Sequence, residues 1–227
     1  IWQAAAADKE HCNAYVIAIP YADLTPEHTA KEWHCEKELF PKYVPVLDFR
    51  TVNLKKMHPD VIFIHNPYDG ANHVTSVDAH YYSNELKKYT ETLVYVPYFV
   101  SGPGITPALC QTPGVVNADY VIVESQVVKT RYEWYYPDQR FSLDKFLVFG
   151  SPKYDKVKNG TKKTYPLPEA WRRRVMEKKI ILYNTSLGAV LEVGEIANTK
   201  LRTVFDFFRR RKDVVIWWRP HPLMKAT

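Results

Sequence analysis

Eight short apolar runs recur along the chain, and most of them are continuous rather than alternating with polar positions. They are AYVIAIP (14–20), VPVLD (44–48), VIFIH (61–65), LVYVPYF (93–99), YVIVES (120–125), FLVFG (146–150), IILYNTS (180–186) and VVIWW (214–218). Continuous runs rich in Val and Ile are typical of strands that are buried on both faces, as in a parallel sheet covered by helices. We therefore expect one mostly parallel sheet that contains the strands at 14–20, 61–65, 93–99, 120–123 and 146–149.

The stretches between these runs are amphipathic or polar, and six of them are helix candidates. They are residues 26–39, 83–90, 106–117, 126–135, 168–177 and 195–211. Strands that alternate with helices in this way predict an α/β, doubly wound fold with helices on both faces of the sheet.

The spacing of the runs also predicts where domains begin and end. The first six strands close at Gly150 and indicate a Rossmann-like N-terminal domain over residues 1–150. Residues 151–168, SPKYDKVKNGTKKTYPLP, are polar and contain prolines and a glycine, which favours a linker. One strand–helix–strand unit cannot close a doubly wound domain, so residues 169–227 are interpreted as the start of a second Rossmann-like domain. The chain is expected to be a fragment that is inactive by itself.

Composition narrows the class of protein. Hydrophobic residues make up 46% of the 227 positions, which is enough for a core, and only three cysteines occur, far apart and without a CxxC pair. This pattern argues against a disulfide framework or a zinc site and suits a reducing compartment. No apolar run approaches the roughly 20 residues that cross a bilayer. We expect a cytoplasmic protein without metal or cofactor, and peripheral contact with the inner face of the membrane stays open.

The basic residues are unevenly distributed along the chain. The formal net charge is +6, and two clusters carry much of the basic excess: Arg172, Arg173, Arg174, Lys178 and Lys179, and then Arg209, Arg210, Arg211 and Lys212. Each cluster alone is best explained as a solvated helix end, because cations favour helix C-termini. Attraction to phosphates or to an anionic membrane surface is the alternative. The chain lacks a basic-aromatic RNA-binding signature, so no nucleic-acid partner is expected.

Ligands of open parallel sheets bind beyond the carboxyl ends of the strands, and the last such end carries RPHP. A guanidinium binds phosphate oxygens with two parallel hydrogen bonds, and an imidazole can move a proton. Pro220 and Pro222 restrict the flanking backbone. Arg219 is therefore a candidate phosphate-binding residue and His221 a candidate catalytic residue, with an ordinary exposed turn as the alternative.

A second strand end, HNPYDGANHVTS (65–76), gathers histidines, an aspartate and asparagines in one glycine-bearing loop. The residues have no metal-ligand spacing, so a substrate-binding or general-base loop is the better interpretation. A turn whose Asn and Asp satisfy their own backbone is the alternative. Asp69 and His73 are the base candidates, and four residues are acceptor-binding candidates: His65, Asn66, Tyr68 and Asn72.

Three further strand ends carry residues that could meet an anion. Gly102 and Gly104 precede a helix candidate whose backbone amides could cradle an anion. Lys153, in GSPKYD, could face a phosphate, or could belong to a turn at the domain boundary. Thr185 and Ser186 end the strand IILYNTS.

Four segments together resemble the order of motifs in the CDP-glycerol glycerophosphotransferase family, enzymes that build teichoic-acid-like polymers on a two-domain GT-B scaffold. They are ADYVIVES (118–125), FLVFGSPKYD (146–155), IILYNTS (180–186) and VVIWWRPHPLM (214–224). The resemblance covers roughly residues 93–227 and implies transfer of glycerol phosphate, or a sugar, from CDP-glycerol or another nucleotide-activated donor to an envelope polymer or lipid-linked acceptor. It implies that Lys153, Thr185, Ser186 and Arg219 hold the donor phosphates.

The chain also departs from the family pattern. The family's W-H-G-T-P-x-K segment, which carries the proposed catalytic histidine, is absent where this chain has LVYVPYFVSGPG, so Asp69 or His73 would have to supply the base. No arginine follows Thr185. Other functions therefore stay open: a nucleotide-sugar glycosyltransferase of GT-B type, a non-catalytic module that keeps the fold, or a binder of nucleic acid or membrane surface through the arginine clusters.

Overall fold

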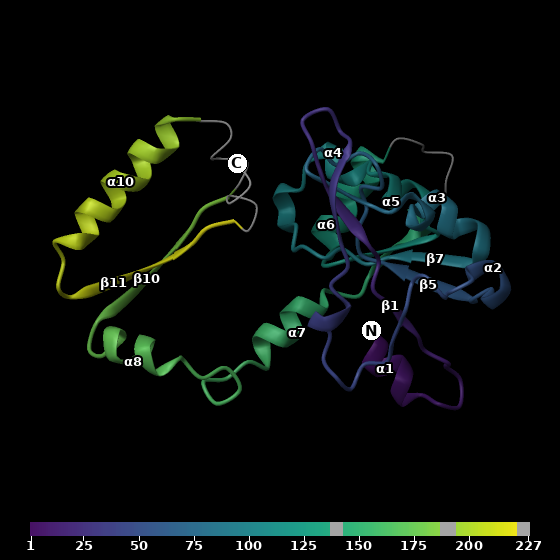
Figure 1. Cartoon of the computed structure of the whole chain (residues 1–227), viewed down its shortest axis with the longest axis horizontal. Coiled ribbons are helices and arrows are strands. Elements are labelled where there is room, and N and C mark those ends of the chain that lie inside the picture. The colour runs from purple at the N-terminus through teal and green to yellow at the C-terminus, as the bar shows by residue number, and fades with distance from the viewer. Residues whose placement is uncertain (137–142, 187–193, 222–227) are drawn as a thin grey trace. The chain divides into compact units, whose positions relative to one another are not determined.

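The computed structural model describes residues 1–136, 143–186 and 194–221, and the chain forms two compact units, Ile1–Asn159 and Gly160–Thr227. Both contain helices and parallel strands, which confirms the α/β class (Figure 1). Each unit is described by itself below.

The first unit is built on a sheet of four parallel strands in the order β5-β7-β8-β9. Their bounds are β5 (Val61–Ile64), β7 (Thr92–Tyr95), β8 (Tyr120–Val123) and β9 (Phe146–Val148). Every second residue of β7 and β8 faces the core, where Leu93, Tyr95, Val121 and Val123 are fully or almost fully buried. Four of the five strands that the apolar runs predicted for one sheet are therefore neighbours in it.

Helices pack against the core side of this sheet: α3 (Ser83–Leu86), α4 (Pro107–Cys110), α5 (Pro113–Asn117) and α6 (Gln126–Tyr135). Helix α6 has the bounds that the sequence predicted, and the Ser125 hydroxyl caps it by accepting the Val128 N–H at 3.4 Å. The single helix expected over 106–117 is wrong. A proline begins each of two short helices there, because Pro113 has no N–H to continue the first.

The other side of the sheet is only partly covered. Val61, Phe63 and Tyr120 point to that side and are 44%, 46% and 42% exposed. We expected helices on both faces of this sheet. Among the described residues of this unit, the helices that build the core, α3 to α6, all pack on one face.

The N-terminal part of the first unit differs most from expectation. β1 (Val16–Ile17) does not join the large sheet but pairs in parallel with β4 (Val46–Leu47). β2 (Tyr21–Leu24), β3 (Ala30–His34) and β6 (Thr75–Val77) form an antiparallel sheet in the order β3-β2-β6. The helix predicted over 26–39 is therefore wrong. A tight turn at 25–29 folds the segment back as a hairpin, with the Thr25 N–H bonded to the Thr29 carbonyl.

Short helical turns connect these strands. They are α1 (Trp2–Ala7), η1 (Lys37–Leu39), α2 (Leu54–Met57), η2 (Ala79–Tyr81), η3 (Lys87–Tyr89), η4 (Gly102–Gly104) and η5 (Leu143–Lys145). The predicted linker 151–168 begins instead with a helix, α7 (Pro152–Lys158), which belongs to the first unit. The Ser151 side chain caps α7 and Pro152 occupies its first position, where a missing N–H costs nothing.

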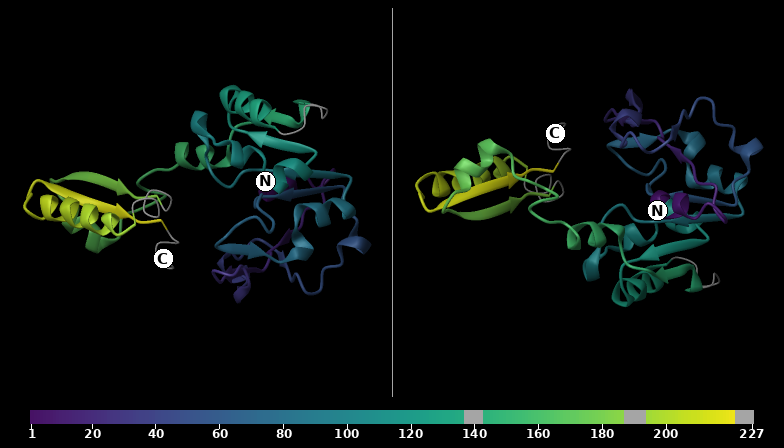
Figure 2. Two further views of the ribbon diagram at one scale, coloured as in Figure 1. Left: turned by 90° about the horizontal axis from the view of Figure 1, so that it is seen from above. Right: turned by 90° about the horizontal axis from the view of Figure 1, so that it is seen from below.

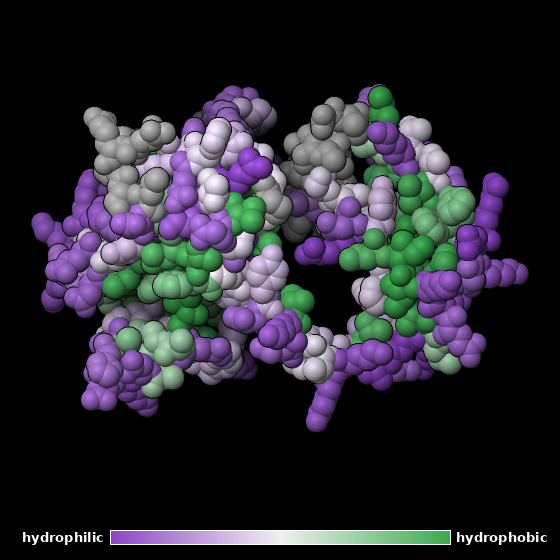
Figure 3. Space-filling model, turned by 180° about the vertical axis from the view of Figure 1, so that it is seen from behind, coloured by the Kyte–Doolittle hydropathy of each residue, from purple (hydrophilic) through white to green (hydrophobic). Residues whose placement is uncertain are grey.

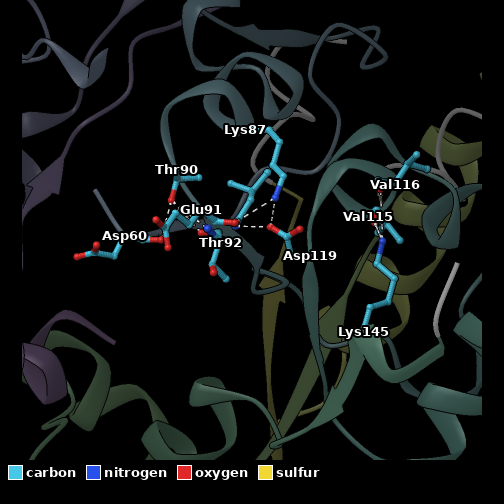
Figure 4. A network of polar contacts seen from close by, with 10 residues as sticks. Asp60, Lys87, Thr90, Glu91, Thr92, Val115, Val116, Asp119 and Lys145 are labelled. Atoms are coloured by element: carbon cyan, nitrogen blue, oxygen red, sulfur yellow. Dashed lines mark hydrogen bonds and ion pairs between the residues drawn. The ribbon is translucent and has the colours of Figure 1, made fainter. Parts of the chain in front are cut away.

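Two polar networks tie the sheet to its helices (Figure 4). The Asp119 carboxylate accepts the Leu93 N–H at 2.7 Å and also pairs with the Lys87 ammonium. The buried Lys145 ammonium donates to the carbonyl oxygens of Val115 and Val116, at 2.9 and 3.3 Å, at the end of α5. These contacts satisfy helix-end and strand-edge groups that would otherwise be costly to bury.

The second unit has a parallel pair of strands, β10 (Lys179–Asn184) and β11 (Val214–Arg219), with one helix on each face. On one face Trp171 of α8 (Glu169–Val175) packs on Trp217, with ring centroids 5.4 Å apart. On the other face Phe205 of α10 (Ile196–Arg209) packs on Trp218 at 5.2 Å. α10 lies along the strands in both Figure 1 and Figure 2. β11 thus has a covering helix on each side, as its continuous apolar run predicted.

Much apolar surface of the second unit stays exposed. Leu182 is 63% exposed and Met176 is 67% exposed, and hydrophobic side chains gather on this unit in the view of Figure 3. The sequence predicted either exposed apolar surface here or a partner that covers it, because strands such as 214–218 have more apolar surface than one helix can hide.

Candidate functional site

The carboxyl ends of the four parallel strands meet at one edge of the large sheet, and three segments with polar side chains lie there. β5 is followed by His65, β7 by the loop 96–104, and β8 by Glu124. Because the strands run in the same direction, these residues share one edge.

Glu124 organises the glycine-bearing loop at this edge. Its carboxylate accepts the Ser101 N–H at 2.6 Å, the Ser101 hydroxyl at 2.8 Å and the Gly102 N–H at 3.3 Å. Gly102 has a φ of 60°, a left-handed conformation that favours glycine. The Ser101 and Gly102 amides are therefore bonded to the protein's own carboxylate, and the anion site expected at the amides of the following helix stays a prediction. A glutamate directly after a buried strand was the signal that could have indicated this.

His65 is anchored by one ring nitrogen. Its Nδ1 donates a hydrogen bond to the Val96 carbonyl oxygen at 2.9 Å, because that oxygen can only accept, and Nε2 is the ring nitrogen left for another partner. The side chain is exposed at the sheet edge. Anchoring of one ring nitrogen by a backbone carbonyl fixes the tautomer of an imidazole that acts as a base through the other. His65 was predicted to bind the acceptor, and its geometry also suits proton abstraction.

Two tyrosine hydroxyls lie near each other at the same edge. The Tyr68 and Tyr98 oxygens are 3.2 Å apart, and their rings meet edge to face. Burial raises the pKa of the Tyr68 hydroxyl, and the hydrogen bond with Tyr98 adds to this effect. Tyr68 therefore stays a neutral phenol that can donate and accept hydrogen bonds. Its predicted role in acceptor binding stays a prediction.

Asp69 lies in the interior of the unit. Its carboxylate, 7% exposed, accepts the Ser83 N–H at 2.9 Å and the Ser83 hydroxyl at 2.6 Å. Burial raises the pKa of Asp69, although the two bonds from Ser83 oppose that shift. Both oxygens thus hold the loop 65–76 to the start of α3, and the role of Asp69 as a base stays a prediction.

The two asparagines of the loop satisfy their own backbone, as the alternative interpretation expected. Asn66 accepts the Tyr68 N–H at 2.9 Å, and Asn72 accepts the Val74 N–H at 3.0 Å and donates to Thr75. His73 lies exposed against His28, with Nδ1 and Nε2 3.3 Å apart. This contact fixes His73 at the turn of the β2–β3 hairpin.

In the second unit the structure places two of the predicted segments next to each other. Asn184 and Arg219 are register partners at the ends of β10 and β11, and the Thr185 N–H donates to the Arg219 carbonyl at 3.3 Å. The Trp218 indole donates to the Thr185 hydroxyl at 3.2 Å. Ser186 and His221 follow directly along the chain. Pro222, predicted to restrict His221, is outside the described residues.

Lys153 belongs to the first unit, in the first turn of α7, where its N–H donates to the Ser151 hydroxyl at 3.4 Å. It is exposed. Its assignment to the donor phosphates stays a prediction.

Sequence reasoning missed one pocket. A surface pocket of about 440 Å³ lies between β3, η1 and residues 47–50, and Trp33, 55% exposed, lines it. Hydrogen bonds from Arg50 at its rim lower the pKa of Asp48 to about 2. We missed the pocket because residues 26–39 were expected to form one helix, whereas β3 and η1, which line the pocket, lie in that segment.

Within residues 1–136, 143–186 and 194–221, no three His, Cys, Asp or Glu side chains come together as a metal site. No helix in the described part of the chain is both long and apolar enough to span a membrane.

The fold is that of an α/β protein with parallel sheets, and polar residues follow the carboxyl ends of its strands. Comparisons with protein-family models, with curated proteins and with solved structures found no match to the chain.

Proposed function

We propose that this chain is part of a GT-B-type transferase that moves glycerol phosphate from a nucleotide-activated donor, CDP-glycerol, to a hydroxyl of an envelope polymer. The observation that carries the proposal is the edge of the second unit, where Thr185 and Arg219 are joined by a backbone hydrogen bond. These are two of the segments whose order resembles the glycerophosphotransferase family. A guanidinium beside hydroxyl groups at a strand end is suited to phosphate oxygens.

The proposed reaction forms one bond and breaks one bond. The acceptor hydroxyl oxygen attacks the phosphorus that carries the glycerol, and the bond from this phosphorus to CMP breaks. A base accepts the hydroxyl proton, and His65, which bonds a backbone carbonyl through Nδ1, is the candidate that the first unit offers for this role. Arg219 stabilises the charge that develops on the departing CMP, and His221 donates a proton to it. The products are a phosphodiester and CMP.

The test is calorimetric titration of the protein with CDP-glycerol, UDP-glucose and GDP-mannose. We expect CDP-glycerol to bind, and Arg219→Ala to weaken its binding by roughly 10- to 100-fold, the effect of one charged hydrogen-bonded contact. Arg202→Ala is the matched control, because Arg202 lies exposed on α10 away from this edge.

Three outcomes decide between the candidates. Preference for a sugar nucleotide would indicate a glycosyltransferase. Binding without release of CMP in the presence of acceptor would indicate a non-catalytic module. Equal weakening by Arg202→Ala and Arg219→Ala would contradict the assignment of the donor phosphates to Arg219.

A further inference from the structure

The pocket beside Trp33 lies beyond the carboxyl ends of a parallel pair of strands. β1 and β4 run in the same direction. Ala18 and Pro20 follow β1, residues 48–50 follow β4, and all of them line the pocket of about 440 Å³. Ligands of parallel sheets bind at such strand ends. The volume falls within the range of about 300–1,000 Å³ that is typical of small-molecule sites.

Hydrogen bonds within the protein hold the walls of this pocket in place. The Cys35 thiol donates to the Ala18 carbonyl, with 3.6 Å between sulfur and oxygen. After β4, the Arg50 N–H donates to the Asp48 carboxylate at 3.0 Å, and the Thr51 N–H donates to the Asp48 carbonyl at 3.0 Å. A pocket whose walls are already bonded loses little conformational entropy when a ligand binds.

One wall of the pocket is an aromatic ring that the fold leaves open to solvent. Trp33 belongs to β3, the edge strand of its sheet, and is 55% exposed, although its register partner Ala22 is fully buried. An exposed tryptophan in a concave site offers a flat, electron-rich face. Polarised C–H bonds of a ligand are attracted to that face, and so are cations. The other groups of the pocket decide between these two kinds of ligand.

The charged groups that line the pocket balance each other. They are two cations, Lys37 and Arg50, and two carboxylates, Glu38 and Asp48. Arg50 binds both oxygens of Asp48, one through Nε at 3.0 Å and the other through Nη2 at 2.6 Å. Because these charges sum to zero, they create no strong field that would draw in a phosphate or an ammonium group. The balance favours a neutral ligand.

The same residues offer both donors and acceptors to such a ligand. Lys37 presents its ammonium N–H groups, and the Nη1 group of Arg50 takes no part in the bonds to Asp48. Glu38 is exposed and contributes a carboxylate, which only accepts. A hydroxyl both donates and accepts. Neighbouring hydroxyls of one ligand can therefore bind a cation and a carboxylate at the same time.

We propose that this pocket binds a neutral pyranose sugar, with a C–H face of the ring against Trp33 and with hydroxyls bonded to Lys37 and Glu38. A pyranose presents C–H groups on its faces and hydroxyls around its rim, so it uses an aromatic wall and polar groups together. His65 and Glu124 are not among the described residues that line the pocket. The inference therefore does not rest on the transfer proposed above.

Two ionic ligands fit the pocket less well than a sugar does. A quaternary ammonium would also pack on Trp33 and gain from Glu38, but Lys37 would repel it. A nucleotide would gain from Lys37, but its phosphates would meet the carboxylates of Glu38 and Asp48. For either ion, attraction to one lining charge is offset by repulsion from another. A neutral sugar uses both kinds of group as hydrogen-bond partners.

The test uses Cys35 as a reporter, because this exposed cysteine lines the pocket. Mass spectrometry follows the rate at which iodoacetamide modifies each cysteine of the full chain. The ligands are methyl β-glucopyranoside, methyl β-galactopyranoside and methyl N-acetyl-β-glucosaminide. We expect at least one of them to slow modification of Cys35. Cys12, an exposed cysteine of the same unit that is not a lining residue, should react at an unchanged rate.

Two variants and a matched control locate the sugar in the pocket. Trp33→Ala removes the aromatic wall and should raise the sugar concentration that protects Cys35 by roughly tenfold or more. Trp134→Ala is the control, because Trp134 is 77% exposed on α6 of the same unit, and it should leave protection unchanged. Glu38→Gln changes only an exposed side chain and should weaken protection by roughly tenfold, the effect of one hydrogen bond to a charged group.

Each outcome supports or overturns the proposal. Protection by a pyranoside that Trp33→Ala weakens and Trp134→Ala keeps supports it. Protection by choline or by CMP in place of the pyranosides would show an ionic ligand and overturn it. Equal protection by sorbitol, a polyol without a ring face, would also overturn it. The same holds if no pyranoside protects Cys35, or if protection survives both Trp33→Ala and Glu38→Gln.

Discussion

At the scale of residues, the polar loop 65–76 contains side chains with two different tasks. Asp69 and the two asparagines bind backbone and side-chain groups of their own unit, so they shape the loop. His65 is held by one nitrogen only and presents the other at the carboxyl edge of the sheet. The sequence analysis named all of these residues as candidates. It could not tell the structural ones from the candidate base, because that distinction depends on which groups lie opposite each side chain in the fold.

His65→Gln tests the role of the imidazole. A glutamine can hydrogen-bond but cannot accept the proton at neutral pH, so we expect CMP release to fall by about 100-fold or more. The melting temperature should change little, because the side chain is exposed. His73→Gln is the comparison. If that variant loses turnover while His65→Gln keeps it, His73 is the base and the assignment to His65 is wrong.

At the scale of elements, the end of α5 depends on a buried lysine. The Lys145 ammonium donates to Val115, Val116 and the Tyr136 hydroxyl, which lies 2.9 Å away, and it lies over the Tyr136 ring. Burial lowers the pKa of Lys145 to about 8. A cation at a helix C-terminus is favourable, yet its desolvation is costly, and the second effect is the larger here.

The free energy of unfolding should therefore rise with pH through this group. Below pH 8 both states bind the proton, and between about 8 and the ordinary value of 10.5 the unfolded chain binds it more than the folded chain. The difference in unfolding free energy between the protein and Lys145→Met should grow across that window by about 2–3 kcal/mol. Urea unfolding at pH 7, 8, 9 and 10 measures it. A difference that stays constant would show that Lys145 keeps an ordinary pKa, and one that falls would show a raised pKa; either result would contradict the prediction.

Helix and strand boundaries followed local signals where those signals agreed with each other. α6 begins at a serine cap and has the predicted bounds, since capping and periodicity coincide there. The segment 26–39 contains helix-forming residues, yet it forms the second strand of a hairpin because β2 offers it an open edge. Here the hydrogen bonds between β3 and β2 decided the structure, and the helix propensity of the segment did not.

At the scale of the whole molecule, the chain divides into two units at Asn159 and Gly160. Each unit has its own parallel strands, and the first carries the larger buried core. The segment between α7 and α8 is mostly exposed and contains Lys162 and Lys163. Two units joined in this way should respond separately to proteolysis and heat.

Limited trypsin digestion should cut first after Lys162 or Lys163, because exposed backbone outside helices and strands is accessible to the protease. Mass spectrometry identifies the site. Calorimetry should show two transitions, with the larger enthalpy for the first unit and its larger core. First cleavage within the sheet of the first unit, or one cooperative transition, would contradict this division.

The sequence by itself predicted six strands that the structure pairs in parallel, β5, β7, β8, β9, β10 and β11. Burial on both faces, from which that prediction was made, does not hold for β5 and β10, whose outer side chains are exposed. The sequence also located the polar strand ends, because those residues come directly after the runs. Only the tertiary structure decided which strand ends share an edge and which polar side chains are bonded within their own unit. It also decided that two basic runs more than thirty positions apart adjoin. These are relations between distant residues. Pairing and burial create them, and no local pattern encodes them.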